Sequence, residues 1–239
     1  MFELRDLNAY YSKSHVVQGI NLTVNAGEAV ALTGRNGVGK TTTLRSVMGL
    51  LVRTEGRILL EGQDISRLST PARANRGIGY VPEERAVFPT MSVEENIMVG
   101  ALVRSDTSLR KSALQRAYEF FPLLRQRHRQ MGGTLSGGQQ KMLALARGIA
   151  LQPKLLMVDE PTEGLMPANV ELVAHALLVA TQESMTVLVV DSSFDLLKTL
   201  CSRMYGMDRG VLIGTYKPTD FNSPDELAAT MLGESRVSC

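Results

Sequence analysis

Three short stretches of the chain are continuously apolar and then stop at a polar or glycine-rich turn. They are AVALTG (residues 29–34), LLMVDE (155–160) and TVLVVD (186–191). Because polar residues do not alternate with the apolar ones, the pattern predicts strands buried on both faces, as in a parallel sheet covered by helices. Open parallel sheets bind ligands beyond the carboxyl ends of their strands, so the three turns predict one common site.

The segments on either side of these strands have other patterns. Before residue 65, short apolar runs are separated by turns at 25–27, Gly56 and Gly62, which predicts antiparallel strands. Residues 92–131 have helical apolar spacing, and the tail SPDELAATML predicts a helix capped by Ser223, with Pro224 at its first position. The predicted fold class is α/β, with an N-terminal antiparallel β part and an inserted helical part.

Composition narrows the class of protein. The chain has 239 residues, of which 44% are hydrophobic and 21% charged, with a net charge of +2, and this is typical of a globular protein. No block of Lys and Arg favours nucleic acid as a partner. Cys201 and Cys239 lie too far apart in sequence for a metal-binding motif. The N-terminus predicts no signal peptide, and no apolar run is long enough to span a membrane.

The turn after the first apolar strand is GRNGVGKTT, residues 34–42. It matches G-x-x-x-x-G-K-[ST], the phosphate-binding loop, and lies between a predicted strand and a predicted helix. Its glycines let main-chain N–H groups surround phosphate oxygens, which the helix N-terminus also favours. Lys40 is predicted to reach the terminal phosphates of a nucleotide, and Thr41 to bind Mg²⁺. The predicted ATP-binding residues of this loop are Gly34, Arg35, Asn36, Gly37, Val38, Gly39, Lys40, Thr41 and Thr42.

Two further motifs complete the predicted chemistry. In LLMVDEPT, Asp159 ends a buried strand, where a carboxylate can hold Mg²⁺, and Glu160 can act as the general base for the attacking water. In LSGGQQ, a serine hydroxyl and the main-chain N–H groups of two glycines precede a predicted helix. They form a second candidate phosphate-binding site. One chain rarely needs two phosphate-binding sites for one nucleotide. We therefore expect a dimer in which the LSGGQ of each chain faces the phosphate loop of the other chain. The signature residues are Leu135, Ser136, Gly137, Gly138 and Gln139.

A phosphate loop, LSGGQ and a strand ending in Asp-Glu, in this order, resemble the nucleotide-binding subunit of ATP-binding cassette (ABC) transporters. The resemblance covers nearly the whole chain and implies further roles. The family's adenine-stacking aromatic matches Tyr11 in AYYS, with Tyr10 the alternative. The segment YVPEERAVFP matches the loop that links the γ-phosphate to the permease, and its usual Gln, which binds the metal, falls on Glu83. In the dimer-contacting segment PTEGLMP, Met166 stands where many members carry Asp.

Other segments are similar to one subfamily, the shorter ATPase of branched-chain amino acid uptake systems. They are YYSKSHVVQGI, GRNGVGKTTTLRSVMGL, GIGYVPEERAVFPTMSVEENIMVGA and EGLMP. The ATPases of urea and short-amide importers are close relatives of that subfamily, and the lipopolysaccharide-export ATPase is expected to be a more distant one.

The strand at 186–190 ends in Asp-Ser-Ser, where most of the family carries a histidine that contacts the γ-phosphate. That position falls on Ser192, and none of His15, His128 and His175 lies within ten residues of it. In one interpretation Ser192 substitutes with a weaker hydrogen bond, and hydrolysis is slower by roughly ten- to a hundredfold. In the other, the chain binds ATP mainly to complete its partner's site. The intact phosphate loop and carboxylate pair favour the first.

The resemblance implies an ATP-hydrolysing subunit of an importer, with ATP and Mg²⁺ as cofactors. The expected partners are a second ABC ATPase subunit, two integral-membrane permeases and an extracytoplasmic binding protein. The expected location is the cytoplasmic face of the inner membrane of a bacterium. We expect one ABC ATPase domain, 1–239, in which about 1–90 and 150–239 form the β subdomain and core, and about 91–149 the helical subdomain.

Three other functions are less consistent with the sequence. ABC proteins of DNA repair need a long coiled-coil insert, for which the segment between Glu83 and Ser136 leaves no room. Those of translation carry two cassettes in one chain, and this chain has one. A non-catalytic regulatory module would be distinguished by the absence of ATP hydrolysis.

Overall fold

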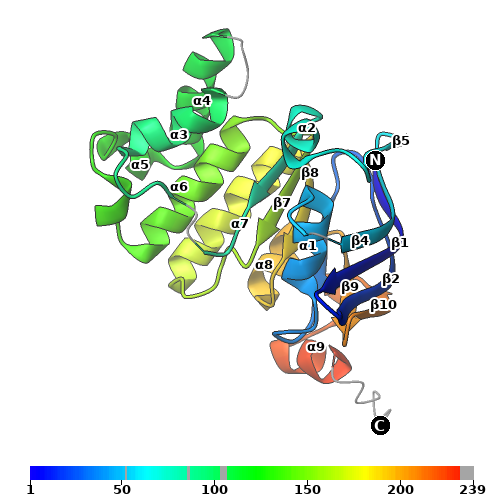
Figure 1. Cartoon of the computed structure of the whole chain (residues 1–239). Helices are drawn as coiled ribbons and strands as arrows, with labels where there is room; N and C mark the ends of the chain where they lie inside the picture. The colour runs from blue at the N-terminus through cyan, green and yellow to red at the C-terminus, as the bar shows by residue number, and fades with distance from the viewer. Residues whose placement is uncertain (52, 85–86, 103–106, 232–239) are drawn as a thin grey trace.

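The computed structural model of the chain describes residues 1–51, 53–84, 87–102 and 107–231 (Figure 1). Cys239 and part of YVPEERAVFP lie outside these ranges. The described strands are β1 Phe2–Tyr11, β2 Ser14–Val24, β3 Ala29–Thr33, β4 Arg53–Leu60, β5 Gln63–Asp64, β6 Ile78–Val81, β7 Leu155–Asp159, β8 Thr186–Val190, β9 Arg203–Asp208 and β10 Val211–Tyr216. The described α-helices are α1 Lys40–Met48, α2 Thr70–Asn75, α3 Val93–Leu102, α4 Thr107–Phe120, α5 Pro122–Gln126, α6 Gly137–Ala150, α7 Pro167–Gln182, α8 Phe194–Leu200 and α9 Pro224–Met231.

The three continuously apolar strands are neighbours in the central sheet. Among the described residues this sheet has the order β10-β9-β3-β8-β7-β6, and every pairing in it is parallel except β10 with β9. The prediction of buried strands in a parallel sheet is therefore confirmed. Because β8 lies between β3 and β7, its terminal turn lies between the phosphate loop and the Asp-Glu pair.

Alternate residues of these strands enter two different cores, which explains why the runs are apolar throughout. In β7, Leu155 and Met157 pack with α1 and the N-terminal sheet. Leu156 and Val158 face the opposite way and pack against residues of α6 and α7. All five residues of the strand are buried, and the same holds for β3 and β8.

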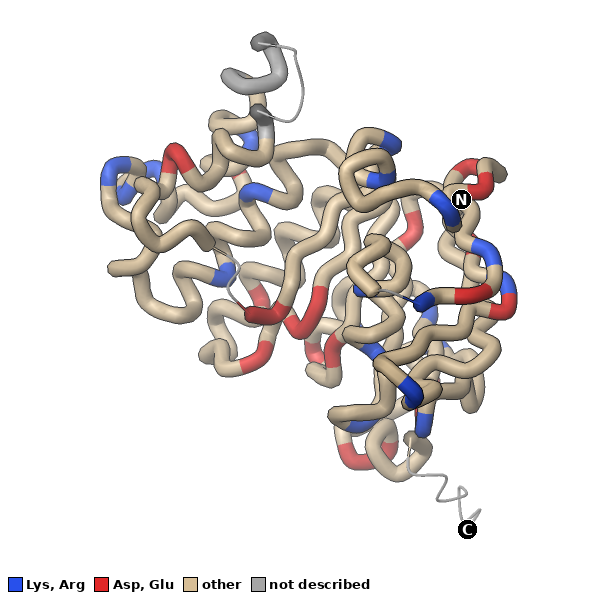
Figure 2. The backbone as a smooth tube through the Cα atoms, in the orientation of Figure 1, with Lys and Arg blue, Asp and Glu red and all other residues tan. Residues whose placement is uncertain are grey.

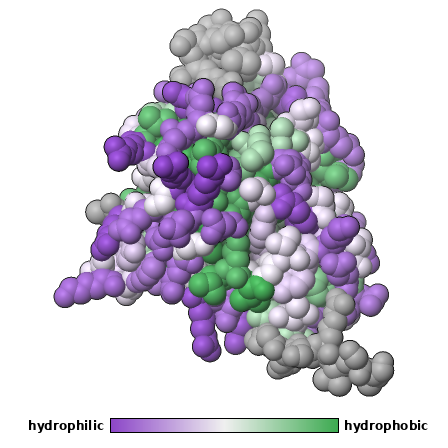
Figure 3. Space-filling view, turned by 90° about the vertical axis from the view of Figure 1, so that its right-hand side faces the viewer, coloured by the Kyte–Doolittle hydropathy of each residue, from purple (hydrophilic) through white to green (hydrophobic). Residues whose placement is uncertain are grey.

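The N-terminal part forms a separate antiparallel sheet, with the order β2-β1-β4-β5. Buried positions recur at short intervals along β1, as expected for a sheet with one face packed on the core. Figure 3 shows the side of the molecule that carries this sheet as mostly hydrophilic, with a narrower apolar strip. The predicted antiparallel N-terminal strands are thus confirmed.

The helical segment lies beside the central sheet, at the left of Figure 1. The predicted helical stretch 92–131 contains α3, α4 and α5, and both α3 and α4 contact α6. The boundaries of a helical subdomain near 91 and 149 remain a prediction, and α6 itself runs to Ala150. In the described part of the chain, no helix combines the length and apolar character needed to cross a membrane.

An ion pair joins the start of β3 to the start of β9. The Arg203 guanidinium donates to both carboxylate oxygens of Glu28, at 2.7 and 3.0 Å. Partial burial alone would raise the pKa of Glu28, but hydrogen bonds from Arg203, the Asn25 main chain and the Ser202 hydroxyl outweigh it and lower the pKa to about 2. The ionised Glu28 therefore stabilises the folded state.

We expect Glu28→Gln to lower the free energy of unfolding at neutral pH by about 1.5–3 kcal/mol, the value of a charged hydrogen bond. Because the folded pKa lies below the ordinary 4.5, this contribution is complete above about pH 5 and is lost as the pH falls towards 2. Urea unfolding between pH 7 and pH 3.5 measures it, and the difference between wild type and variant should shrink over the acid half of that range.

Glu3→Gln is the matched control. Glu3 also pairs with an arginine, at 2.7 Å from Arg5, but this arginine is 53% exposed and the pair lies on the surface. Surface ion pairs contribute little, so this variant should unfold almost as the wild type does. A Glu28→Gln effect that stayed constant down to pH 3.5 would contradict the assignment.

Candidate active site

The phosphate loop connects β3 to α1 and is shaped by glycines with close neighbours. A Cβ on Gly34 would lie 2.2 Å from the Met207 carbonyl oxygen of β9, so no larger residue fits there. Gly39, with φ 113°, is the N-cap of α1. Gly37 faces open space, because a Cβ added there would meet no atom within 4 Å, and this leaves room for a ligand to approach the main chain. The loop has the geometry that an anion at a helix N-terminus requires.

Lys40 is buried, and its ammonium group lies across the loop. Its Nζ donates to the carbonyls of Gly34 at 2.9 Å and Arg35 at 3.0 Å, and lies 3.4 Å from Glu160 Oε1. The predicted phosphate-binding cation and the predicted base therefore meet at the ends of β3 and β7. A phosphate group that entered the loop would replace the carbonyls as the partner of this ammonium.

Thr41 and Asp159 supply two oxygen atoms at one point. The Thr41 hydroxyl donates to Asp159 Oδ1 at 3.0 Å, and the Tyr80 hydroxyl donates to Oδ2 at 3.0 Å. Burial raises the pKa of Asp159, and the bonds from Thr41 and Tyr80 oppose this shift. Mg²⁺ in such enzymes takes one or two protein oxygens together with phosphate and water, and the Thr41–Asp159 pair fits that requirement. In the described residues no group of three or more acidic, His or Cys side chains could form a protein-only metal site.

Glu160 has an unusual main-chain conformation, with φ 48° in the left-handed region. Its N–H donates to the Val190 carbonyl at 2.8 Å, and its own carbonyl accepts from Lys141 Nζ at 2.9 Å. Burial raises the pKa of the Glu160 carboxyl, which the charge of Lys40 partly offsets. A strained main-chain conformation persists only where neighbouring groups hold it, and here the two main-chain hydrogen bonds do so. This conformation places the Glu160 carboxylate beside Lys40.

The phosphate loop opens into a cavity of about 260 Å³. Its lining residues are Asn36, Gly37, Gly39, Lys40, Thr41, Thr42, Glu83, Glu160 and Glu163. Burial, a hydrogen bond with Glu163 and the charges of Asp159 and Glu160 all raise the pKa of Glu83. Figure 2 shows acidic residues gathered beyond the ends of the central strands. The role of Glu83 as a metal ligand remains a prediction.

Glu163 lines this cavity although no sequence motif assigns it to the site. It follows Glu160 by three residues in DEPTEG, inside the segment for which the family resemblance implies only a dimer contact. The one sequence signal is a third carboxylate close behind the Asp-Glu pair. Its position depends on the turn after β7 and not on a local pattern.

Asp191 and Ser192, at the end of β8, have different surroundings. Asp191 is buried and accepts hydrogen bonds from the Thr162 N–H and hydroxyl and from the Ser193 N–H. It therefore fixes the segment after Glu160 to the end of β8. Ser192 is exposed and borders a second cavity of about 270 Å³, between the start of the phosphate loop and α9.

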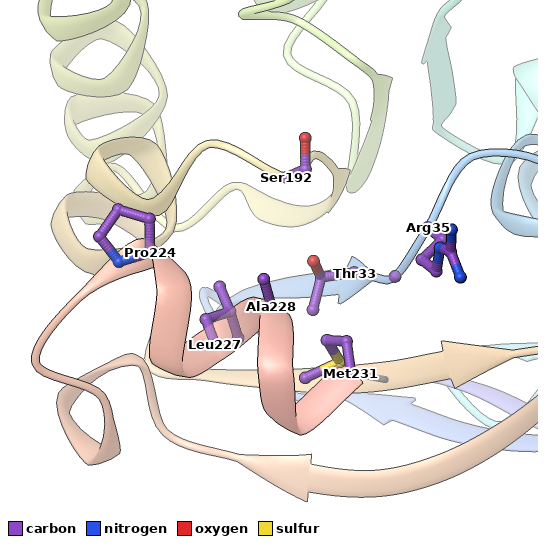
Figure 4. A pocket seen from close by; sticks show the side chains of 8 residues that line it. Thr33, Arg35, Ser192, Pro224, Leu227, Ala228 and Met231 are labelled. Carbon is purple, nitrogen blue, oxygen red and sulfur yellow. The ribbon is translucent and has the colours of Figure 1, made fainter. Parts of the chain in front are cut away.

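Figure 4 shows this second cavity, with Arg35 on one side and Leu227, Ala228 and Met231 of α9 on another. In this view the Ser192 hydroxyl points away from α9. Ser192 is not among the described residues that line the cavity of the phosphate loop. Its contact with a γ-phosphate remains a prediction.

Tyr10 and Tyr11, the two candidates for stacking on adenine, differ in availability. The Tyr10 ring stacks on His15, with centroids 4.4 Å apart, and the Arg53 guanidinium lies 4.1 Å from its centroid. His15 and Arg53 come from β2 and β4, the strands on either side of β1. Tyr11 is 42% exposed and lies near Arg45 of α1, so it is the one that can take a base.

The signature residues begin α6. Ser136 is the N-cap and accepts from the Gln139 N–H, and the Gln139 side chain accepts from the Ser136 N–H, which forms a capping box. Ser136 and Gly137 are exposed, whereas Leu135 is buried. Among the described residues that line the cavity at the phosphate loop of this chain, there is none of the five signature residues. Met166, at 69%, is also strongly exposed. Both features are compatible with contacts in a second subunit.

The fold and the site define a nucleoside triphosphatase of the phosphate-loop class. The family described as ABC transporter matches residues 17–163, and the chain belongs to this family as an ATP-binding ATPase subunit. ATP-binding subunits of this family work with membrane permease components. The family and fold class predicted from the sequence are thus confirmed.

Three similarities describe its relatives. The chain is 35% identical to the lipopolysaccharide export system ATP-binding protein LptB of Escherichia coli (strain K12) over 232 residues, which cover 96% of each chain. It is 32% identical to the high-affinity branched-chain amino acid transport ATP-binding protein BraG of Pseudomonas aeruginosa over 213 residues, 89% of this chain and 91% of BraG. The dimeric post-hydrolysis structure of the ATP-binding cassette MJ0796, bound to ADP and Pi, has the same fold, with a TM-score of 0.82, 22% identity and coverage of 91% and 99%.

One expectation needs correction. The subfamily motifs placed the lipopolysaccharide-export ATPase further away than the branched-chain amino acid ATPases. The identities of 35% and 32% do not support that order. Similar identities to ATP-binding proteins of both groups do not separate the transported substrates.

Proposed function

We propose that the chain hydrolyses Mg²⁺-ATP to power the uptake of branched-chain, hydrophobic amino acids. The observation that supports catalysis most directly is the convergence of Lys40 and Glu160 beside the Thr41–Asp159 pair. The importer assignment rests on the subfamily motifs and on the similarity to BraG. In this proposal the chain lies on the cytoplasmic face of the inner membrane and is held there by its permeases.

Each residue has a distinct role in the proposed reaction. The loop amides and Lys40 bind the phosphates, and Tyr11 stacks on the base. Thr41 and Asp159 hold Mg²⁺, which neutralises phosphate charge when bound. Glu160 accepts the proton of the attacking water, for which its raised pKa suits it. Positioning and electrostatic stabilisation carry most of the catalysis, as in phosphoryl transfer generally.

The signature residues are proposed to act on the ATP of a second subunit. That subunit is expected to be a longer paralogue, which together with this chain encloses two ATP molecules. Closure would then move the helical segments and two permeases, and an extracytoplasmic binding protein would deliver the substrate. The exposed Ser136 and Gly137 support this arrangement, because a residue that reads a partner's phosphate must be accessible.

The uptake proposal is tested in cells that lack this chain, with the wild-type protein or its Glu160→Gln variant restored. We expect uptake of radiolabelled leucine to require the wild-type chain, while uptake of labelled urea does not change. Leucine uptake that is independent of the chain, with urea uptake dependent on it, would favour the urea and short-amide alternative.

Lipopolysaccharide export is the second candidate, because LptB is 35% identical over 96% of its length. In that case depletion of the chain would reduce newly made lipopolysaccharide at the cell surface and leave the uptake of both small molecules unchanged. The same depletion experiment therefore distinguishes all three substrates.

We expect Ser192→His to leave ATP turnover unchanged or to raise it, by up to about tenfold. A histidine at this position adds a stronger donor for the γ-phosphate, and one additional hydrogen bond of about 1.4 kcal/mol corresponds to that factor. Steady-state phosphate release measures the change. The neighbouring Ser193 is not a suitable control position, because its side chain caps α8. A large loss of turnover in Ser192→His would show that the serine has a specific role.

A further inference from the structure

Tyr80 occupies a position on β6 from which its hydroxyl reaches the adjacent strand. β6 and β7 pair in parallel with Tyr80 beside Met157, and the tyrosine side chain extends to Asp159 at the end of β7. Its hydroxyl donates to Asp159 Oδ2 at 3.0 Å. The tyrosine is half-buried, so this hydrogen bond is partly protected from water.

The two oxygens of Asp159 are held by two different elements. Oδ1 accepts from Thr41 on α1 and Oδ2 from Tyr80 on β6, at 3.0 Å each. Together these two hydrogen bonds fix the rotation of the Asp159 carboxylate about its Cβ–Cγ bond. The Thr41 hydroxyl would also serve as a ligand of the metal ion, whereas the Tyr80 hydroxyl contacts Asp159 from the side of β6. Tyr80 is thus the partner of Asp159 that acts on the carboxylate alone.

Arg45 of α1 lies close to the hydroxyls of both Tyr80 and Tyr11. The Tyr80 hydroxyl has a single proton, and it donates this proton to Asp159 Oδ2.

We propose that Tyr80 is a positioning residue that orients Asp159 for Mg²⁺. The inference rests on the proposed role of Asp159 in holding the metal. Outer hydrogen-bond partners of metal ligands typically contribute about 10- to 100-fold in metal affinity. The effect should therefore appear in metal binding and not in the binding of ATP alone.

The test uses Tyr80→Phe in the full-length chain, which keeps the ring and removes only the hydroxyl. Electron paramagnetic resonance with Mn²⁺ as the probe measures metal binding to the ATP complex. We expect the half-saturating Mn²⁺ concentration to rise by about tenfold or more. The Kd for ATP in EDTA should stay within about twofold of the wild-type value, because the phosphate loop is unchanged. At saturating Mg²⁺, most of the ATP turnover should return.

Tyr118→Phe is the matched control, because the Tyr118 hydroxyl is buried in α4 with no hydrogen-bond partner among the described residues. It should bind Mn²⁺ as the wild type does. The Tm of Tyr80→Phe and of Tyr118→Phe shows whether each variant is folded.

Unchanged Mn²⁺ affinity in folded Tyr80→Phe would overturn the inference. An equal loss in Tyr118→Phe would also overturn it, since that would show a general effect of removing a buried hydroxyl. Failure of the proposed function is distinguishable, because the wild-type ATP complex itself would then show no specific Mn²⁺ binding.

Discussion

Replacing Glu160 by Gln should reduce ATP hydrolysis by about 10²- to 10⁴-fold, the usual contribution of a general base. The Glu160 carboxylate lies beside the Lys40 ammonium, at 3.4 Å, and burial raises its pKa. Glutamine keeps the shape and the main-chain contacts but cannot accept the proton. ATP binding should persist or become tighter, because one negative charge near the phosphates is removed.

Phosphate release and equilibrium binding of ATP, measured side by side, check this prediction. Glu171→Gln provides the control, because Glu171 is an exposed carboxylate on α7, outside the phosphate cavity. Turnover in Glu160→Gln equal to that of the control would refute the assignment of the base. Loss of ATP binding together with turnover would instead indicate a structural role for Glu160.

The second large effect is expected on stability, for Arg73→Met. Arg73 is only 4% exposed, and its guanidinium donates to four main-chain carbonyls within 2.6–2.9 Å. Two of them, of Ser46 and Val47, belong to the last turn of α1. The Ser46 carbonyl also accepts from the Gly49 N–H, whereas among the described residues the Val47 carbonyl has Arg73 as its donor. Gly49 ends that helix, and a Cβ there would lie 3.1 Å from the Arg73 guanidinium carbon. The arginine therefore caps the helix that begins with Lys40.

Methionine has a comparable apolar stem but no donors, so the carbonyls of Val47, Ser66 and Leu68 lose the Arg73 donor, while Ser46 keeps its bond from the Gly49 N–H. We expect the free energy of unfolding to fall by about 3 kcal/mol or more, since each unsatisfied group costs about 1–3 kcal/mol before relaxation. For a chain of this size that lowers the Tm by roughly 6–12 °C. Thermal unfolding of the purified variant gives the value.

Arg76→Met serves as the comparison, because Arg76 is the exposed C-cap residue of the same short helix. Surface substitutions of this kind usually change stability by less than about 0.5 kcal/mol. Equal Tm values for the Arg73 and Arg76 variants would show that the four hydrogen bonds contribute little.

The parts of the fold that were predictable from sequence depend on local signals. The strands β3, β7 and β8 are recognisable because every residue is buried, and a run of apolar residues records that directly. The phosphate loop is recognisable because its glycines and Lys40 follow a fixed spacing. Both signals are contained within a dozen residues, so no knowledge of the distant chain was needed.

Tyr80 and Arg73 could not be identified from the sequence, because their roles come from contacts with residues far away along the chain. Tyr80 donates to a carboxylate 79 positions away, and Arg73 donates to carbonyls 26 and 27 positions away. In the sequence they are an ordinary strand tyrosine and an ordinary basic residue of a short helix. Ser192 is an intermediate case: counting along β8 identified its position, but the cavity that it borders could be found only from the packing of α9.

The most direct test of hydrolysis at this site is phosphate release by the wild-type chain with its partner ATPase, when the partner's own catalytic glutamate has been replaced by Gln. Only the site with Lys40, Asp159 and Glu160 of this chain then retains its base. We predict Mg²⁺-dependent phosphate release clearly above that of the preparation in which Glu160→Gln is added. Release that is equal in the two preparations, with ATP bound in both, would contradict catalysis at this site and would leave the chain a role in ATP binding alone.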